Sequence, residues 1–220
     1  MRRMDIAMRK IIDLTMPMYD GAPTMPMDPK LSISRHCSLD DLGYNLSRVV
    51  TSTHQGTHID AARHFLHDGE CIDEIALERF IVKAVRVDLT SKKSKEAICV
   101  PDLLPYEDYI DDGHCVLLNT GWDKKFPNNE YFSEFPYITT ELADWFAEKG
   151  ISLIGMDMPT PNGQDWKYVH IKMLGAGVLI VEGLTNIELL PTSEPFMFYS
   201  LPLKLKGIDG SPVRAIAILE

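Results

Sequence analysis

Apolar and polar residues alternate along several short stretches of this 220-residue chain, which is the pattern of β-strands. The first stretch, residues 11–15, leads into a loop that contains four prolines. Residues 46–60 are rich in Val, Thr and Ser and have no helical period, so one or two strands are expected there. Further strands are predicted at residues 80–89, 114–119, 151–156 and 178–181.

Residues 139–150 have the spacing and the ends of an amphipathic helix. A hydroxyl residue opens the segment, apolar residues recur at helical spacing, and a glycine closes it. A shorter helix is predicted at residues 168–174. The pattern indicates a mixed α/β fold, and because no repeat or linker divides the chain, residues 1–220 are expected to form a single domain.

Composition and charge exclude several classes of partner. The net charge is −10, so the chain repels phosphate backbones and anionic lipids, and neither nucleic acid nor a membrane is expected. The longest apolar run, residues 173–181, is far shorter than the roughly 20 residues of a membrane helix. The N-terminal residues lack a signal-peptide core, which favours a cytoplasmic protein. The four cysteines form no C-x-x-C pair and are interpreted as ordinary thiols.

Three of the seven histidines lie within residues 54–64. On a strand, His54, Gly56, His58 and Asp60 would share one face, and the glycine would leave room there for an ion. A helix would bring the two histidines together but rotate the aspartate away. Imidazole and carboxylate without thiolate suit a divalent ion that keeps one coordination position open for water.

The remaining motifs have ordinary interpretations. His36, His67 and His114 stand apart from this cluster, and Arg63 is interpreted as a structural or surface charge. The chain contains no G-x-S-x-G and no H-E-x-x-H, and the glycines at 175 and 177 do not extend to G-x-G-x-x-G. The sequence therefore does not support a serine hydrolase or a dinucleotide-binding protein.

The segment HQGTHIDAARH at residues 54–64 resembles the signature H-x-G-T-H-x-D-x-P-x-H of the cyclase family of metal-dependent hydrolases, which includes bacterial kynurenine formamidase and isatin hydrolase. The similarity extends through nearly the whole chain, at residues 12–15, 119–122, 155–157, 181–184, 201–203 and 210–215. The resemblance implies a swivelling β/β/α fold, assembly as a homodimer or homotetramer, and one or two divalent ions, zinc or manganese.

The resemblance also implies roles for six side chains of this sequence. The implied metal ligands are His54, His58, Asp60, His170 and Glu182, with Asp60 and Glu182 bridging, and the implied catalytic acid/base is His64. The residues themselves place Glu182 at the end of a buried strand, where an unpaired charge would cost several kcal/mol unless a cation compensates it.

Two positions depart from the family pattern. Ala62 replaces the proline of the signature, which removes a rigid turn element but no reactive group. The segment Pro-Thr-Met-Pro at residues 23–26 replaces a P-x-W-P segment that places a tryptophan against the aromatic substrate of kynurenine formamidases. Met25 is therefore the expected substrate contact, because its thioether adapts to an aromatic ring.

The activity that the resemblance implies is that of an arylformamidase of tryptophan catabolism, which hydrolyses N-formylkynurenine to kynurenine and formate. A metal-activated water would attack the amide while His64 moves the proton. One alternative is hydrolysis of another small amide, lactam or ester, as in isatin hydrolase. The other is a metal-binding protein without catalysis, which would need the five ligands but not His64. Because imidazole ligands must be neutral, metal loss is expected as the pH falls through about 6.

Overall fold

The computed structural model describes residues 10–192 and 194–219. Within these residues the central feature is a nine-stranded sheet in the order β1-β13-β11-β5-β7-β9-β10-β4-β12. β5, β7, β9 and β10 are parallel, and the outer pairs are antiparallel. The strands are β1 (Lys10–Asp13), β4 (His58–Asp60), β5 (Ile81–Asp88), β7 (Cys115–Asn119), β9 (Leu153–Met156), β10 (Leu179–Glu182), β11 (Phe196–Tyr199), β12 (Gly210–Pro212) and β13 (Ile216–Leu219).

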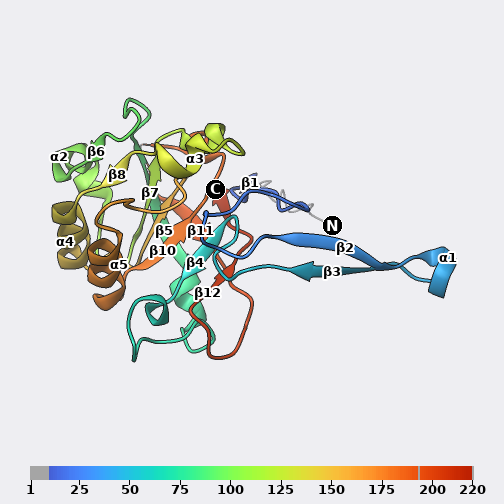
Figure 1. Cartoon of the computed structure of the whole chain (residues 1–220). Coiled ribbons are helices and arrows are strands. Elements are labelled where there is room, and N and C mark those ends of the chain that lie inside the picture. The colour runs from blue at the N-terminus through green and yellow to red at the C-terminus, as the bar shows by residue number, and fades with distance from the viewer. Residues whose placement is uncertain (1–9, 193, 220) are drawn as a thin grey trace, which may run out of the picture.

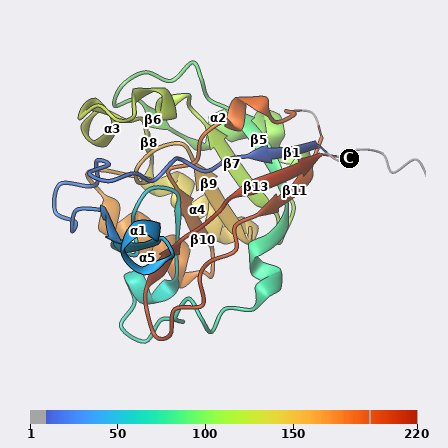
Figure 2. The same ribbon diagram turned by 90° about the vertical axis from the view of Figure 1, so that its right-hand side faces the viewer.

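Two helices, α4 (Thr140–Lys149) and α5 (Trp166–Gly175), cover one face of the parallel strands (Figure 1). Figure 2 shows β1, β13 and β11 side by side at the edge of the molecule away from these helices. The connections carry short elements: 3-10 helices η1 (Ala62–His64), η2 (Leu77–Phe80), η3 (Leu104–Tyr109), η4 (Trp122–Lys125) and η5 (Ile187–Leu189), α2 (Val100–Leu103), α3 (Glu130–Ser133), β6 (Ala97–Ile98) and β8 (Tyr137–Ile138).

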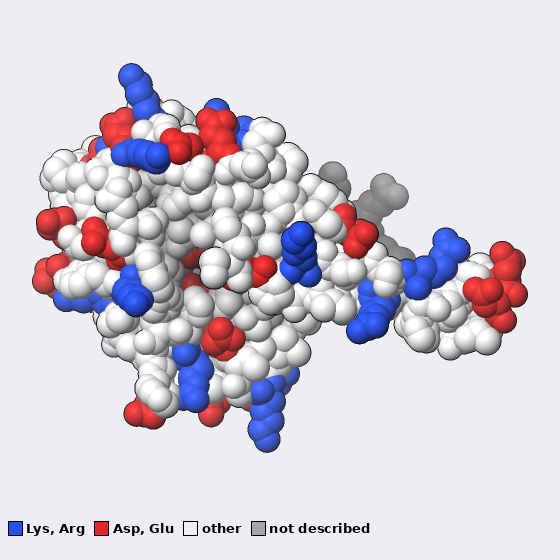
Figure 3. Space-filling model, viewed as in Figure 1, with Lys and Arg blue, Asp and Glu red and all other residues white. Residues whose placement is uncertain are grey.

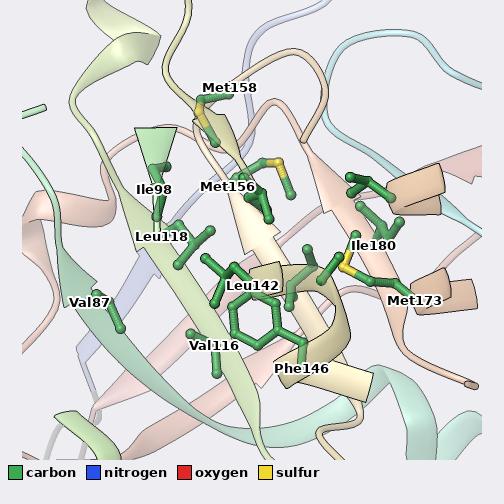
Figure 4. Close-up of a cluster of buried hydrophobic side chains, with 14 of the residues drawn as sticks. Val87, Ile98, Val116, Leu118, Leu142, Phe146, Met156, Met158, Met173 and Ile180 are labelled. Atoms are coloured by element: carbon green, nitrogen blue, oxygen red, sulfur yellow. The ribbon is translucent and has the colours of Figure 1, made fainter. Parts of the chain in front are cut away.

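Two hydrophobic clusters pack against opposite faces of the sheet. Val116 and Leu118 of β7 contribute to the cluster that includes Phe146 of α4, drawn in Figure 4. Leu117, between them, points to the other face and belongs to the second cluster, together with Phe198 of β11. This alternation follows from the pleat of a strand, and burying each such side chain stabilises the fold by about 1.5–3 kcal/mol.

The predicted helices and strands correspond to observed elements. In α4, the hydroxyl of Thr139 accepts a hydrogen bond from the backbone N–H of Leu142 at 3.2 Å, and Gly150 ends the helix with a φ of +68°. These are the N-cap and the left-handed C-terminal residue that the sequence predicted. The predicted strands at 11–15, 80–89, 114–119, 151–156 and 178–181 correspond to β1, β5, β7, β9 and β10, and the predicted helix at 168–174 lies within α5.

A long antiparallel ribbon, which we call the arm (residues 32–50), projects from the body of the molecule (Figures 1 and 3). It consists of β2 (Ser32–Cys37), α1 (Leu39–Leu42) and β3 (Leu46–Val50). Large apolar side chains are exposed along it: Leu39, Leu42, Tyr44, Leu46, Val49 and Val50. An isolated two-stranded ribbon is only marginally stable in water, so this surface is suited to being covered.

At the end of the nine-stranded sheet that is opposite to β1, β4 lies between β10 and β12. Asp60 is opposite Ile180 of β10 and Gly210 of β12, and His58 is opposite Glu182. Three segments far apart in the sequence therefore meet at this strand. No helix in the described part of the chain is long and apolar enough to cross a membrane. All four cysteines are free thiols, as predicted.

Candidate metal centre

The centre of the site is β4, a three-residue strand whose first and last side chains share a face. The Nδ1 of His58 lies 2.9 Å from the carbonyl oxygen of Gly56, and because a carbonyl only accepts, Nδ1 carries the proton. The other nitrogen, Nε2, faces the centre and offers a lone pair to a cation when the ring is neutral. It lies 3.5 Å from Oδ1 of Asp60 and 3.3 Å from Oε2 of Glu182.

The second imidazole is oriented by the same device. Nδ1 of His170 on α5 donates to the carbonyl oxygen of Trp166, one helical turn earlier, at 2.7 Å. Its Nε2 then faces Oε1 of Glu182 at 3.4 Å and Oδ2 of Asp60 at 3.7 Å. Each carboxylate thus lies between the two imidazoles, the arrangement that bridging ligands require.

His54 reaches the centre by a route that the sequence did not predict. The expectation that it shares a strand face with Gly56, His58 and Asp60 is wrong, because the strand begins only at His58 and Gly56 has a left-handed φ of +63°. His54 lies in the preceding turn, yet its Nδ1 is 2.8 Å from Oδ1 of Asp60. A Cβ on Gly210 would lie 2.9 Å from Cε1 of His54, so only glycine at 210 lets the ring approach.

The donor set fits a divalent ion. His58, Asp60 and Glu182 are buried, and their ligand atoms lie within 4.8 Å of one another. Among the described residues, Oδ2 of Asp60 is one of the few buried side-chain atoms without a hydrogen-bond partner. Two donors bound to one tetrahedral zinc ion lie roughly 3.3–3.6 Å apart, which is close to the observed spacings. A cation would satisfy an oxygen that is otherwise costly to bury.

The carboxylates control the charge of the imidazoles. Burial opposes protonation of His54, but the carboxylates of Asp60 and Asp209 raise its pKa to about 10. Burial likewise opposes protonation of His58 and His170, and the carboxylate of Glu182 raises the pKa of both. Protons thus balance the negative charge of the site, and a bound cation would replace them.

His64, on η1, packs beside His54, and a ring nitrogen of His64 lies within 4.8 Å of ligand atoms of His54 and Asp60. The two rings are stacked, and Nδ1 of His64 lies 3.3 Å from Oδ2 of Asp209. The same oxygen lies 2.9 Å from Nε2 of His54, and these contacts hold the pKa of Asp209 well below its usual range. Sequence reasoning missed Asp209, whose one signal is its position directly before the family-like segment 210–215.

A cavity of about 460 Å³ opens over the cluster. His58, His64, His170 and Glu182 line it together with Met25, the predicted substrate contact. Two aromatic residues that sequence reasoning missed, Phe65 and Trp166, also line it, and their rings meet at an angle with centroids 5.6 Å apart. Phe65 stacks on His170 at 4.4 Å. Phe65 and Trp166 thus supply an aromatic surface in the cavity wall, although Met25 stands where the kynurenine formamidases have a tryptophan.

The remaining histidines and Arg63 lie outside the cavity lining, as expected. His36 and His67 are exposed, and Nδ1 of His114 lies 3.1 Å from the carbonyl oxygen of Tyr109. Arg63 is exposed and donates to the carbonyl oxygen of His67.

Comparison with known proteins places this site in a family. The family model described as "Putative cyclase" matches residues 12–162. The chain belongs to the cyclase family of hydrolases. A kynurenine formamidase of Bacillus cytotoxicus is 32% identical over 212 residues, which cover 93% of this chain and 95% of the relative.

Solved structures of cyclase-family proteins share the fold. Isatin hydrolase A from Ralstonia solanacearum superposes with a TM-score of 0.87 at 24% identity, covering 96% of this chain and 92% of the other. A predicted metal-dependent hydrolase from Bacillus stearothermophilus gives a TM-score of 0.80 at 28% identity, covering 96% and 99%. These similarities confirm the swivelling β/β/α fold that the family resemblance implied.

Proposed function

We propose that this cyclase-family protein is a metal-dependent amidohydrolase, and specifically an arylformamidase that converts N-formylkynurenine to kynurenine and formate. The proposed ligands are His54, His58, Asp60, His170 and Glu182, which would hold one or two divalent ions, zinc or manganese. The similarity to kynurenine formamidases over nearly the full length supports this choice of substrate.

One observation carries the proposal. The buried donors of His58, Asp60 and Glu182 converge beside a cavity that is also lined by the imidazole of His64, which lies next to His54 and Asp60. A metal carrier needs the donors, but it has no use for a second cavity-lining imidazole such as His64. A hydrolase needs both, since a water must lose a proton and the leaving nitrogen must gain one.

The chain's own residues account for the proton transfers. A divalent ion bound by the five ligands would activate a water molecule and polarise the substrate carbonyl. His64 accepts a proton from the attacking water and delivers it to the nitrogen that leaves as the arylamine. Its side chain is 28% exposed, so it reaches the cavity while remaining packed against its neighbours.

The cavity wall favours an aromatic substrate. Phe65 and Trp166 offer ring edges and faces on the same wall as the metal cluster, and Met25 supplies a polarisable thioether. Aromatic pairs contribute about 0.5–1.5 kcal/mol beyond the burial of area, and a sulfur against a ring contributes a similar amount. An anilide such as N-formylkynurenine would gain from both kinds of contact.

The test is a substrate panel with the purified protein, loaded with zinc or with manganese. We expect turnover of N-formylkynurenine that a chelator abolishes and that added metal restores. Turnover of isatin alone would contradict the arylformamidase and favour the lactam hydrolase. Stoichiometric metal binding without turnover of any amide, lactam or ester in the panel would contradict the enzyme and leave a metal-binding protein.

We also propose a cytoplasmic homodimer or homotetramer in which a second copy of this chain covers the arm. The support is the row of exposed apolar side chains on a ribbon that projects from the body, whose tip carries the acidic residues Asp40 and Asp41 (Figure 3). Light scattering after size exclusion would show an oligomer that Val49→Ser weakens. A monomer at micromolar concentration would contradict the assembly.

A further inference from the structure

Asp209 occupies a place in the site that neither the donor cluster nor the acid/base residue explains. Its Oδ2 lies 2.9 Å from Nε2 of His54 and 3.3 Å from Nδ1 of His64, so one oxygen contacts a proposed metal ligand and the proposed proton carrier. The side chain is 36% exposed, at the edge of the cluster rather than among the buried donors. It is also more than 140 residues away from both histidines in the sequence.

The backbone holds this carboxylate in register with the site. The N–H of Ala61 donates to the carbonyl oxygen of Asp209 at 2.9 Å, and the next residue, Gly210, pairs with Asp60 across β4 and β12. The second carboxylate oxygen, Oδ1, accepts a hydrogen bond from the hydroxyl of Thr53 at 3.2 Å. Both the main chain and the side chain of Asp209 are therefore fixed before any ligand arrives.

The contacts of Asp209 decide which nitrogen of each ring is available. Nε2 of His54 is directed at the carboxylate, so Nδ1 is the nitrogen that faces Asp60 and would bind an ion. In His64 the carboxylate takes Nδ1, which leaves Nε2 for the substrate. A carboxylate that receives the outer N–H of a ligand histidine orients the ring and makes it a stronger ligand.

We propose that Asp209 is the positioning residue of this site, which aligns His54 for metal binding and His64 for proton transfer through a single carboxylate oxygen. The role in proton transfer rests on the proposed function, whereas the role in metal binding does not. Loss of such a partner typically lowers metal affinity or activity by about 10–100-fold.

The first experiment measures Zn²⁺ affinity by competition with a chromophoric chelator. Asp209→Asn should bind Zn²⁺ about 10–100-fold more weakly than the wild type, with the same number of ions at saturation. The matched control is Asp68→Asn, which removes the same charge from an exposed turn and should leave affinity unchanged. An unchanged affinity in Asp209→Asn would overturn the proposal, and so would the loss of one bound ion, since Asp209 would then be a ligand.

The second experiment tests whether Asp209 acts through His64. At saturating metal, Asp209→Asn should lower kcat by roughly tenfold or more and change KM little, and it should cause no further loss in a His64→Ala background. Losses that multiply in the double variant would overturn the role in proton transfer. A wild type without arylformamidase activity would contradict the proposed function alone, because the Zn²⁺ titration still tests Asp209.

A folding defect in Asp209→Asn would not leave the question open. Thr53→Val keeps the carboxylate but removes the hydroxyl that holds Oδ1, so it should weaken Zn²⁺ binding in the same direction by a smaller factor. Wild-type affinity in Thr53→Val, combined with a misfolded Asp209→Asn, would assign Asp209 to folding and overturn the proposal.

Discussion

The imidazole rings of His54 and His64 lie stacked, with centroids 3.9 Å apart and planes inclined by 28°. Phe65 meets the ring of His64 edge-on at 4.5 Å, so His64 is confined by two neighbours. Two stacked rings repel each other if both are positively charged imidazolium ions. Because His54 must be a neutral imidazole to bind a cation, metal loading removes the positive charge of His54 from beside the ring of His64.

The first prediction concerns this separation of roles. His64→Ala should keep the full complement of bound metal and lose about 10²–10⁴-fold in kcat, the usual contribution of a general acid/base. Metal content by atomic absorption and initial rates with N-formylkynurenine measure the two effects. His114→Ala, a half-exposed histidine outside the cavity lining, is the matched control and should retain both. Unchanged turnover in His64→Ala would contradict the acid/base role.

The second prediction concerns protons released by the metal. The carboxylates of Asp60 and Asp209 raise the pKa of His54 to about 10 against the effect of burial, so this ring is protonated in the metal-free protein at neutral pH. Metal binding must displace the proton, and affinity should therefore keep rising between about pH 7 and 9, well above the range of an unperturbed histidine. The sequence predicts that metal is lost as the pH falls through about 6, and the raised pKa of His54 shifts this expected loss to a higher pH.

Calorimetry in two buffers of different ionisation enthalpy counts the released protons. At pH 7.5 we expect about one proton or more for each ion bound. A flat affinity above pH 7, with no proton released, would show that the ligand histidines are neutral and would contradict the proposed charge balance.

The third prediction concerns the aromatic wall. Trp166→Leu should raise KM for N-formylkynurenine by roughly 2–12-fold, which corresponds to the 0.5–1.5 kcal/mol of an aromatic contact. An N-formyl aliphatic amine serves as the control substrate, since it has no ring to contact Trp166. Equal changes for both substrates would mean that the substitution perturbs the metal centre, because the carbonyl oxygen of residue 166 also orients His170.

The fourth prediction concerns stability. Burial and the nearby carboxylate of Asp123 raise the pKa of Asp157 to about 7, although the N–H groups of Thr120 and Gly121 donate to it at 2.9 and 2.6 Å. The folded state therefore keeps a proton that the unfolded state loses near its ordinary value of 3.8. The contribution of Asp157 to the free energy of unfolding should fall as the pH rises between about 4 and 7, by up to about 1.4 kcal/mol per pH unit.

Asp157→Asn removes this titration while keeping an oxygen for the two N–H groups. The difference in free energy of unfolding between wild type and variant should shift in favour of the variant from pH 4 to pH 7. Urea denaturation at a series of pH values measures it. A difference that stays constant, or that favours the wild type at the higher pH, would mean that Asp157 is ionised throughout this range.

Local patterns accounted for much of the fold and of the site. The hydroxyl at Thr139 and the glycine at Gly150 bound a helix by short-range interactions, so α4 is visible in the sequence. The shared face of His58 and Asp60 is also visible in the sequence, because side chains two residues apart on a strand point to the same face. The family resemblance added His170 and Glu182 as ligands, and the structure brings both to the centre.

Non-local pairing accounted for the failures. His54 could not be placed by strand parity, because the left-handed backbone of Gly56 interrupts the strand, and glycine adopts either sign of φ without a sequence marker. Asp209 reaches the site because β12 pairs with β4, and no short-range pattern reports a pairing between segments so far apart. The roles of Phe65 and Trp166 likewise depend on how η1 and α5 pack together.

The pairing of β12 with β4 also sets the order of events during synthesis of the protein. The ribosome completes all five proposed ligands once Glu182 has been added, but Asp209 and Gly210, which hold His54 in place, follow 27 and 28 residues later. A nascent chain halted after β10 therefore carries the donors without the strand that completes their sheet. The donors of the proposed metal centre are therefore complete in the chain before the strand that fixes the position of His54.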